Sequence, residues 1–224
     1  MLTVCTVAVG DRYVRSATQL AARIPGLVVL TDRPDEVGGM PIARPSEWFF
    51  DEKSFNYSRS KRTVIQEAGS TRVLFLDADA VLTERFDLAR IEWLAVQGAI
   101  QSPYVFSAYG FSVAKIRDSR VIYESLTPKL KQLTELGLLD SGDVERLRRF
   151  RMPFECVMLF DLPQMTDFLA RWEALESLFG EKGPQTPNRW AAECNFIGLA
   201  AFECGIEVVG LQEKAGILHH DYLL

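Results

Sequence analysis

Residues 73–82 read Val-Leu-Phe-Leu-Asp-Ala-Asp-Ala-Val-Leu, a short apolar run that passes directly into two carboxylates spaced one residue apart. An apolar run of this length, with a glycine and a serine shortly before it and acids after it, predicts a buried strand. Asp77 and Asp79 then lie where that strand leaves the sheet. Because ligands of open α/β sheets bind at the carboxyl ends of strands, this edge is the first candidate for a functional site.

Asp77 and Asp79 also have the chemistry of a metal site. Two carboxylates about 4 Å apart repel each other by about 4 kcal/mol at an effective dielectric constant of about 20. A divalent cation removes this repulsion, and such oxygen ligands suit Mn²⁺ or Mg²⁺. The alternative is that one aspartate caps the following turn while the other is solvated.

The composition is that of a globular protein. The chain has 224 residues, of which 48% are hydrophobic and 25% charged, and this predicts one domain over residues 1–224. The net charge of −5 argues against a nucleic-acid-binding function, which needs a basic surface.

No segment approaches the roughly 18 apolar residues of a membrane span. Residues 1–10 resemble a first strand more than a signal peptide, so we expect a cytoplasmic protein with reduced, buried cysteines. A peripheral role at a membrane stays open.

Apolar runs alternate with helical periodicities along the chain, which predicts an α/β fold with a mainly parallel sheet covered by helices. The expected strands cover residues 2–9, 27–30, 72–76, 154–161, 206–209 and 216–218. The expected helices cover residues 12–24, 58–68, 118–136, 141–150, 163–178 and 190–204. The first of them is expected to bury one apolar face, formed by Tyr13, Ala17, Leu20 and Ile24. Residues 33–56 are expected to form a long irregular connection.

In this order, the features resemble a GT-A glycosyltransferase, most closely the glycogenin-like and bacterial galactosyltransferase-like group. The resemblance rests on the end of the first strand at residues 6–10, on Asp32 after the second strand, and on the Asp-x-Asp motif at residues 77–79. It continues in residues 192–195, which match an acidic helix, and in residues 218–221, which match a terminal histidine. It implies a single-domain, Rossmann-like GT-A fold.

The resemblance further implies transfer of a sugar from a nucleotide diphosphate sugar, with a UDP-sugar as the expected donor, to a saccharide, lipid-linked or protein acceptor. The residues that it assigns to donor binding are Thr6, Val7, Ala8, Gly10, Asp32, Lys61, Arg62, Asp77 and Ala78. The residues that it assigns to Mn²⁺ or Mg²⁺ are Asp77, Asp79 and His219, with His220 as the alternative histidine.

Each of these assignments has a plainer alternative. Asp32 can initiate a turn before its arginine and proline. Lys61 and Arg62 can belong to a solvated helix face. The two adjacent histidines can be surface residues of a loose tail.

Catalysis needs a further carboxylate. An inverting enzyme uses one as a base for the acceptor hydroxyl, and a retaining enzyme needs a carboxylate or amide on the other face of the donor. Glu193 is the first candidate because it lies on an otherwise apolar helix, where an unpaired carboxylate is costly, and Glu155 is the second. The alternative is that Glu193 only pairs with Arg189 or Lys182 at the helix start.

Two departures from the family pattern keep other functions open. Glu155 and Cys156 stand where the group has a small polar residue and glycine, and residues 220–224 lack its glycine and lysine after the histidine. A non-catalytic GT-A-like nucleotide-binding module is therefore one alternative. Another is a haloacid-dehalogenase-like phosphatase with Asp77 as nucleophile, although that family places its motif near the N-terminus.

Overall fold

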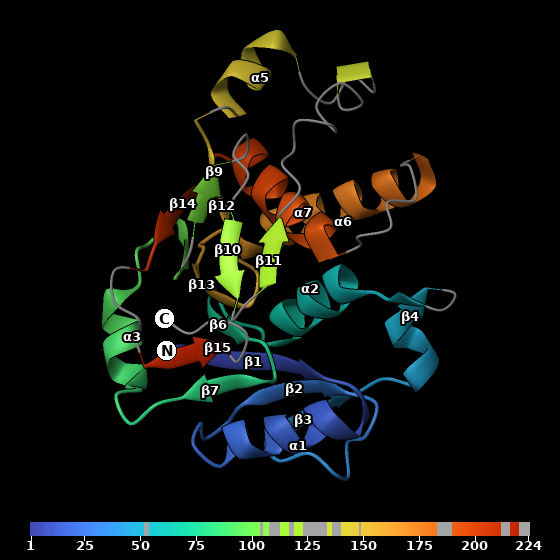
Figure 1. The fold of residues 1–224 in the computed structure, drawn as a ribbon, viewed down its shortest axis with the longest axis vertical. Coiled ribbons are helices and arrows are strands. Elements are labelled where there is room, and N and C mark those ends of the chain that lie inside the picture. Colours follow the sequence, from blue (N-terminus) through green and yellow to red (C-terminus); the bar gives the residue numbers. More distant parts are fainter. Residues whose placement is uncertain are drawn as a thin grey trace.

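The computed structural model describes residues 1–51, 54–103, 105–107, 113–116, 119–122, 134–135, 140–147, 149–182, 190–211 and 216–219. Its centre is a seven-stranded sheet in the order β14-β8-β13-β6-β1-β2-β3 (Figure 1). The strands are β1 (Thr3–Ala8), β2 (Val28–Thr31), β3 (Met40–Ala43), β6 (Arg72–Leu76), β8 (Ala99–Ser102), β13 (Val157–Asp161) and β14 (Glu207–Gly210). Only β13 runs against its neighbours in this sheet; the other pairs are parallel. The predicted α/β class and mainly parallel sheet are confirmed.

Helices cover both faces of the sheet and enclose two apolar cores. One core lies under α1 (Gly10–Ala21) and α3 (Leu88–Leu94). The other lies under α2 (Tyr57–Glu67), α6 (Met165–Lys182) and α7 (Trp190–Glu203), with the fully buried Trp172 in it. Burial of a large apolar side chain contributes about 1.5–3 kcal/mol, so these two cores account for a large part of the stabilisation. That residues 1–224 form a single domain stays a prediction.

Shorter elements surround the sheet. They are η1 (Ser46–Phe49), β4 (Phe50–Asp51), β5 (Ser54–Phe55), β7 (Ala80–Leu82), β9 (Val105–Ser107), β10 (Val113–Ile116), β11 (Ser119–Ile122), α5 (Ser141–Leu147), β12 (Arg151–Pro153) and β15 (Ile217–His219). The short strands pair as β4 with β5, β7 with β15, β9 with β12 and β10 with β11. In the described part of the chain, no helix has the length and apolar character needed to cross a membrane.

The strand order reverses between β1 and β6. From β1 the chain continues outward to β2 and then β3, whereas the later strand β6 lies on the other side of β1. At such a reversal, the connections after the two strands leave in opposite directions, and a crevice forms at their carboxyl ends. Gly10 follows β1 and Asp77 follows β6, so the fold directs both residues to this edge.

Several local predictions were wrong. Residues 33–56 contain the edge strand β3, the helix η1 and the β4–β5 hairpin, where an irregular connection was expected. β3 is short and largely exposed, and its Pro41 argues against a strand in the sequence, because sheets accept proline only at edges, strand starts or bulges. The expected helix over 118–136 was wrong at residues 119–122, which form β11, and residues 123–133 lie outside the described part.

Two predictions of burial also need correction. Tyr13, expected on the buried face of the first helix, is 38% exposed, and Val14 takes its place in the core. Cys5 and Cys156 are buried free thiols as expected, but Cys204 is exposed. Tyr13 and Val14 are adjacent in α1, so the apolar periodicity alone did not show which of the two points into the core.

Candidate functional site

The acidic pair lies directly after β6. The Asp77 N–H donates a hydrogen bond to the Cys156 carbonyl (2.9 Å), which fixes the chain as it leaves the strand. The Asp77 carboxylate lies 3.3 Å from the Lys61 ammonium, and the Asp79 carboxylate 3.8 Å from the Arg12 guanidinium. The Asp77 and Asp79 side chains are 24% and 13% exposed, so both are within reach of a ligand.

Lys61 extends from α2 to the acidic pair and is almost completely buried. Its Nζ also donates to the Glu155 carbonyl (3.2 Å) and lies 5.1 Å from the centre of the Phe75 ring. A buried ammonium is stable only with such partners, because loss of its hydration is costly. The alternative of a solvated helix face for Lys61 and Arg62 is therefore wrong, since both residues are buried.

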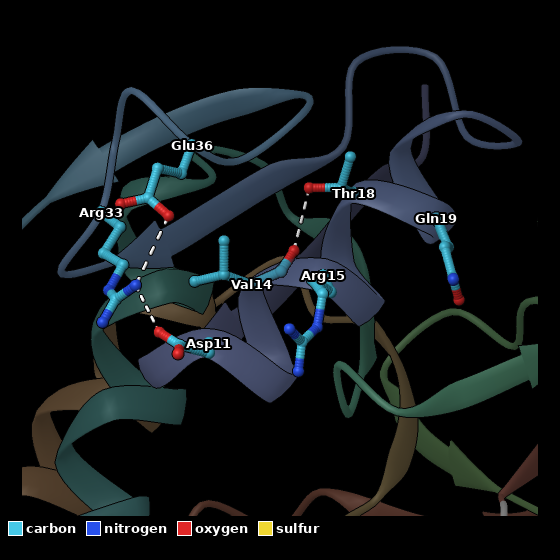
Figure 2. Close-up of a pocket in the computed structure, with 7 residues that line it drawn as sticks. All are labelled: Asp11, Val14, Arg15, Thr18, Gln19, Arg33 and Glu36. Atoms are coloured by element: carbon cyan, nitrogen blue, oxygen red, sulfur yellow. Dashed lines mark hydrogen bonds and ion pairs between the residues drawn. The ribbon is translucent and has the colours of Figure 1, made fainter.

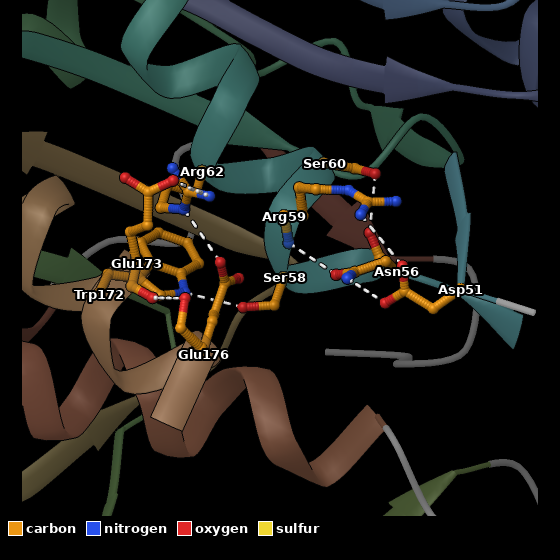
Figure 3. A network of polar contacts seen from close by, with 10 residues as sticks. Asp51, Asn56, Ser58, Arg59, Ser60, Arg62, Trp172, Glu173 and Glu176 are labelled. Carbon is orange, nitrogen blue, oxygen red and sulfur yellow. Dashed lines mark hydrogen bonds and ion pairs between the residues drawn. The ribbon is translucent and has the colours of Figure 1, made fainter. Parts of the chain in front are cut away.

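The next residue, Arg62, extends to α6. Its Nη2 lies 3.0 Å from Glu173, and its Nε donates to Glu176 Oε2 at 3.0 Å, as Figure 3 shows. Successive residues of a helix point about 100° apart, which explains why adjacent cations have different partners. The structure thus brings Lys61 to the acidic pair and joins Arg62 to the neighbouring helix.

The segment before β13 forms one wall of the site. Because β13 is antiparallel to β6, its first residues lie beside the last residues of β6, with Val157 opposite Leu76. Ser102, fully buried on β8, both donates to the Phe154 carbonyl (2.9 Å) and accepts from the Phe154 N–H (3.2 Å). Glu155, the second catalytic candidate, is buried in this wall and close to Lys61.

Cys156, noted in the sequence only as a departure from the pattern of the resembled group, belongs to the same wall. Burial raises the pKa of the Cys156 thiol well above its usual range, and the charges of Asp77 and Glu155 raise it further. Since the thiolate is the reactive form, this thiol is inert near neutral pH. Cys156 contributes backbone and packing to the site, not a nucleophile.

Asp32 joins the ends of β1, β2 and β3. Its Oδ1 accepts from the Gly10 N–H (3.3 Å), and its Oδ2 accepts from the Ser46 hydroxyl (2.9 Å). Gly10 has a φ of +78° and begins α1, so this carboxylate stands at the start of a helix. Asp32 is thus placed beside Gly10, as the resemblance implied, but part of its hydrogen-bonding capacity is used within the protein.

The other residues assigned to the donor are largely covered. Thr6, Ala8 and Ala78 are buried, and Ala8 and Ala78 belong to the core under α1. The Thr6 hydroxyl has no hydrogen-bond partner within the described residues. Val7 is half-buried and packs against the other core.

β15 brings the last candidate ligand back to the acidic pair. It pairs antiparallel with β7, and in that register His219 lies opposite Ala80, the residue after Asp79. The Gly216 carbonyl accepts from the Thr83 N–H (2.7 Å) and fixes the start of β15. The side chain of His219 and all of His220 lie outside the described part.

The donor set suits a hard divalent cation. Asp77 and Asp79 offer carboxylate oxygens at an exposed edge, as Mn²⁺ and Mg²⁺ require. Among the described side chains, no group of three or more histidines, cysteines and acids gathers closely enough to hold a metal. A third ligand from the position of His219 is therefore part of the prediction.

Glu193 lies in the first turn of α7. The structure does not describe its side chain, and residues 183–189, including its alternative partner Arg189, also lie outside the described part. Its catalytic assignment and the alternative ion pair both stay predictions.

A separate pocket of about 490 Å³ lies on the outer side of α1 (Figure 2). Its lining residues are Asp11, Val14, Arg15, Thr18, Gln19, Arg33 and Glu36. Arg33 forms ion pairs with Asp11 and Glu36 across it. None of the residues predicted for the donor or the metal lines this pocket.

Comparison with known proteins gives resemblance at the level of structure only. No family model matches the chain, and no curated protein matches it. Three similar solved structures are described here. The bifunctional glycosyltransferase WbbM, in its apo form, has a TM-score of 0.45 and 13% identity, over 78% of this chain and 34% of that one. The glycosyltransferase GlyE of Streptococcus pneumoniae, also in its apo form, has a TM-score of 0.45 and 11% identity, over 93% of this chain and 45% of that one.

The third is a CMP:2-keto-3-deoxy-manno-octonic acid synthetase in complex with CTP, with a TM-score of 0.44 and 14% identity, over 93% of this chain and 88% of that one. The chain thus spans about a third of the WbbM chain and less than half of the GlyE chain.

Proposed function

We propose that the protein is a metal-dependent glycosyltransferase that moves a sugar from a nucleotide diphosphate sugar, with a UDP-sugar as the expected donor, to an acceptor hydroxyl. The observation that carries the proposal is the acidic pair after β6, at the reversal of strand order, with the buried Lys61 3.3 Å from Asp77. The register of β15, which puts His219 opposite Ala80, adds a ligand position beside Asp79. The acceptor and the stereochemical outcome stay open.

The main chemical demand of the reaction is to stabilise the diphosphate as it leaves. Asp77, Asp79 and His219 would hold Mn²⁺ or Mg²⁺, and the ion supplies Lewis-acid stabilisation of the phosphate oxygens when bound. Lys61 adds a fixed positive charge in a desolvated position, where it interacts more strongly than in water. Gly10 and Asp32, which are hydrogen-bonded to each other, are assigned to the nucleoside.

The acceptor hydroxyl also has to lose its proton. Glu193 in the first turn of α7 is our first candidate for the carboxylate that serves the acceptor or the anomeric centre. Glu155 is the second, and its buried place beside Lys61 supports an electrostatic role in the same site. A general base must lie within hydrogen-bond reach of the hydroxyl that it deprotonates, so a complex with an acceptor would distinguish the two.

Thermal unfolding with nucleotide and metal tests the proposal directly. We expect UDP with Mn²⁺ to raise the melting temperature by about 5–10 °C, because a ligand at about 100 times its Kd adds about 2.7 kcal/mol of stability. Replacement of Mn²⁺ by EDTA should remove the shift, and GDP in place of UDP tests the base. No shift with either nucleotide would contradict the proposal, and screening should then turn to phosphate esters.

A further inference from the structure

The helix that carries Lys61 is fixed to α6 by a polar cluster in which Ser58, Arg62 and Trp172 are buried and Glu173 is 60% exposed. The Trp172 indole N–H donates to the Ser58 hydroxyl (2.7 Å), one turn before Arg62. Arg62 contacts Glu173 and Glu176, both at 3.0 Å (Figure 3). Because Ser58 and Arg62 are four residues apart, they lie on the same side of α2 and both contact α6. We call the contact of Arg62 with the two glutamates the Arg62 clamp.

The clamp adds directional contacts to the apolar packing of α2. Ser58, Arg62 and Trp172 are all buried, so each lost hydrogen bond would leave a desolvated polar group without compensation. The guanidinium is planar and uses two different nitrogens on two carboxylates, which makes the contact directional. A directional contact opposes rotation and sliding of α2, which apolar side chains would partly tolerate.

Lys61 depends on this restriction because it is the residue adjacent to the clamp. Its ammonium lies 3.3 Å from Asp77 and 3.2 Å from the Glu155 carbonyl, and only the position of α2 brings the long, flexible stem there. A small rotation of the helix would move Lys61 and Arg62 together. The partners of Arg62 thereby set the place of the cation at the acidic pair.

We propose that Arg62 and Glu176 are positioning residues: they hold α2 in the register in which Lys61 reaches the acidic pair, and thereby strengthen binding of the diphosphate. This inference rests on the proposed function of that site. Neither Arg62 nor Glu176 is assigned a contact with the donor in this proposal, which replaces the earlier expectation that Arg62 binds it.

Two variants test the proposal, with UDP and Mn²⁺ as the probe and calorimetric titration as the measurement. Arg62→Met removes the guanidinium and keeps a long side chain, while Glu176→Gln keeps the shape and removes only one charge of the clamp. We expect each to raise the Kd for UDP with Mn²⁺ about tenfold. Glu176→Gln keeps the test meaningful if Arg62→Met does not fold.

The matched control is Arg171→Met, also on α6. Arg171 forms an ion pair with Glu203 on α7 and belongs to neither the clamp nor the acidic site. We expect this variant to lower the melting temperature but leave the Kd unchanged. The proposal would be overturned if the clamp variants and Arg171→Met bound UDP with Mn²⁺ equally well. If the unchanged protein bound neither UDP nor GDP, the proposed function would be contradicted instead.

A double-mutant cycle with Lys61→Met separates positioning from a general loss of structure. If Arg62 acts through Lys61, then Arg62→Met should change the Kd less than twofold in a chain that already carries Lys61→Met. An equal, about tenfold, change in both backgrounds would show that Arg62 acts independently of Lys61, and would overturn the proposal.

Discussion

An Asp79→Ala variant is expected to lose the Mn²⁺-dependent binding of UDP, with at least about a hundredfold rise in the Kd. Replacement of residues that merely support metal ligands already costs about 10–100-fold in affinity, and Asp79 is assigned to the metal itself. The physical reason is that Asp77 alone cannot compensate a divalent charge at this partly exposed edge. Calorimetric titration of UDP in Mn²⁺ and in EDTA would measure the effect.

The same variant offers a second, qualitative result. Removal of the Asp79 carboxylate takes away a proposed metal ligand as well as the ion-pair partner 3.8 Å from Arg12. Any remaining affinity for UDP should therefore be the same in Mn²⁺ and in EDTA. Asp35→Ala, at an exposed aspartate, is the control and should bind UDP as the unchanged protein does. Undiminished Mn²⁺ dependence in Asp79→Ala would contradict the metal assignment.

Gly216→Ala is expected to destabilise the protein by about 3 kcal/mol and to lower the melting temperature by about 6–12 °C. Gly216 has a φ of +72°, which costs an L-residue about 1–2 kcal/mol. An added Cβ would also lie 2.3 Å from the Phe86 nitrogen and 2.5 Å from the Arg85 carbonyl carbon. These are backbone atoms that cannot rotate away, so β15 must separate from β7 to relieve the contact.

Gly205→Ala is the matched control for this effect. Gly205 has a similar φ of +67°, but no atom lies within 4 Å of an added Cβ, so it reports the conformational cost alone. We expect Gly205→Ala to keep its affinity for UDP with Mn²⁺, whereas Gly216→Ala loses affinity because His219 follows on β15. Equal melting temperatures of the two variants would mean that a Cβ at position 216 does not clash with the backbone of residues 85–86.

The sequence predicts well those strands and helices whose pattern of apolar residues lies within a short segment. Residues 72–76 and 58–68 were predicted almost to their bounds, because a continuous apolar run and a helical periodicity are properties of a few adjacent residues. β3 was missed because it is short and contains Pro41, a residue that sheets accept only at edges, strand starts or bulges. The direction of β13 could not be predicted either, since pairing with β6 and β8 depends on the path of the whole chain.

The site shows the same limit. Asp32, Asp77 and Asp79 could be chosen as candidates from the sequence because they lie just after strands, and strand ends converge at one edge. The sequence could not separate Lys61 from Arg62, which are adjacent in the chain but have partners on different elements. Ser102 on β8 and Cys156 lie at the site because β13 runs antiparallel between β8 and β6, which the sequence does not show. Arg12 lies there because α1 begins directly after β1.

The pairing of β15 with β7 has a consequence for the order in which the protein matures during synthesis. Its two strands are separated by residues 83–216, more than half of the sequence, so their contact closes a long loop and forms late in folding. A chain that is still being synthesised contains β1, β2 and β6 first, because synthesis proceeds from the N-terminus. Yet it presents an acidic pair without the position of His219 until residues 217–219 emerge. Binding of metal by the proposed ligand set would therefore follow the pairing of β15 with β7, and folding intermediates without this pairing would bind the metal more weakly.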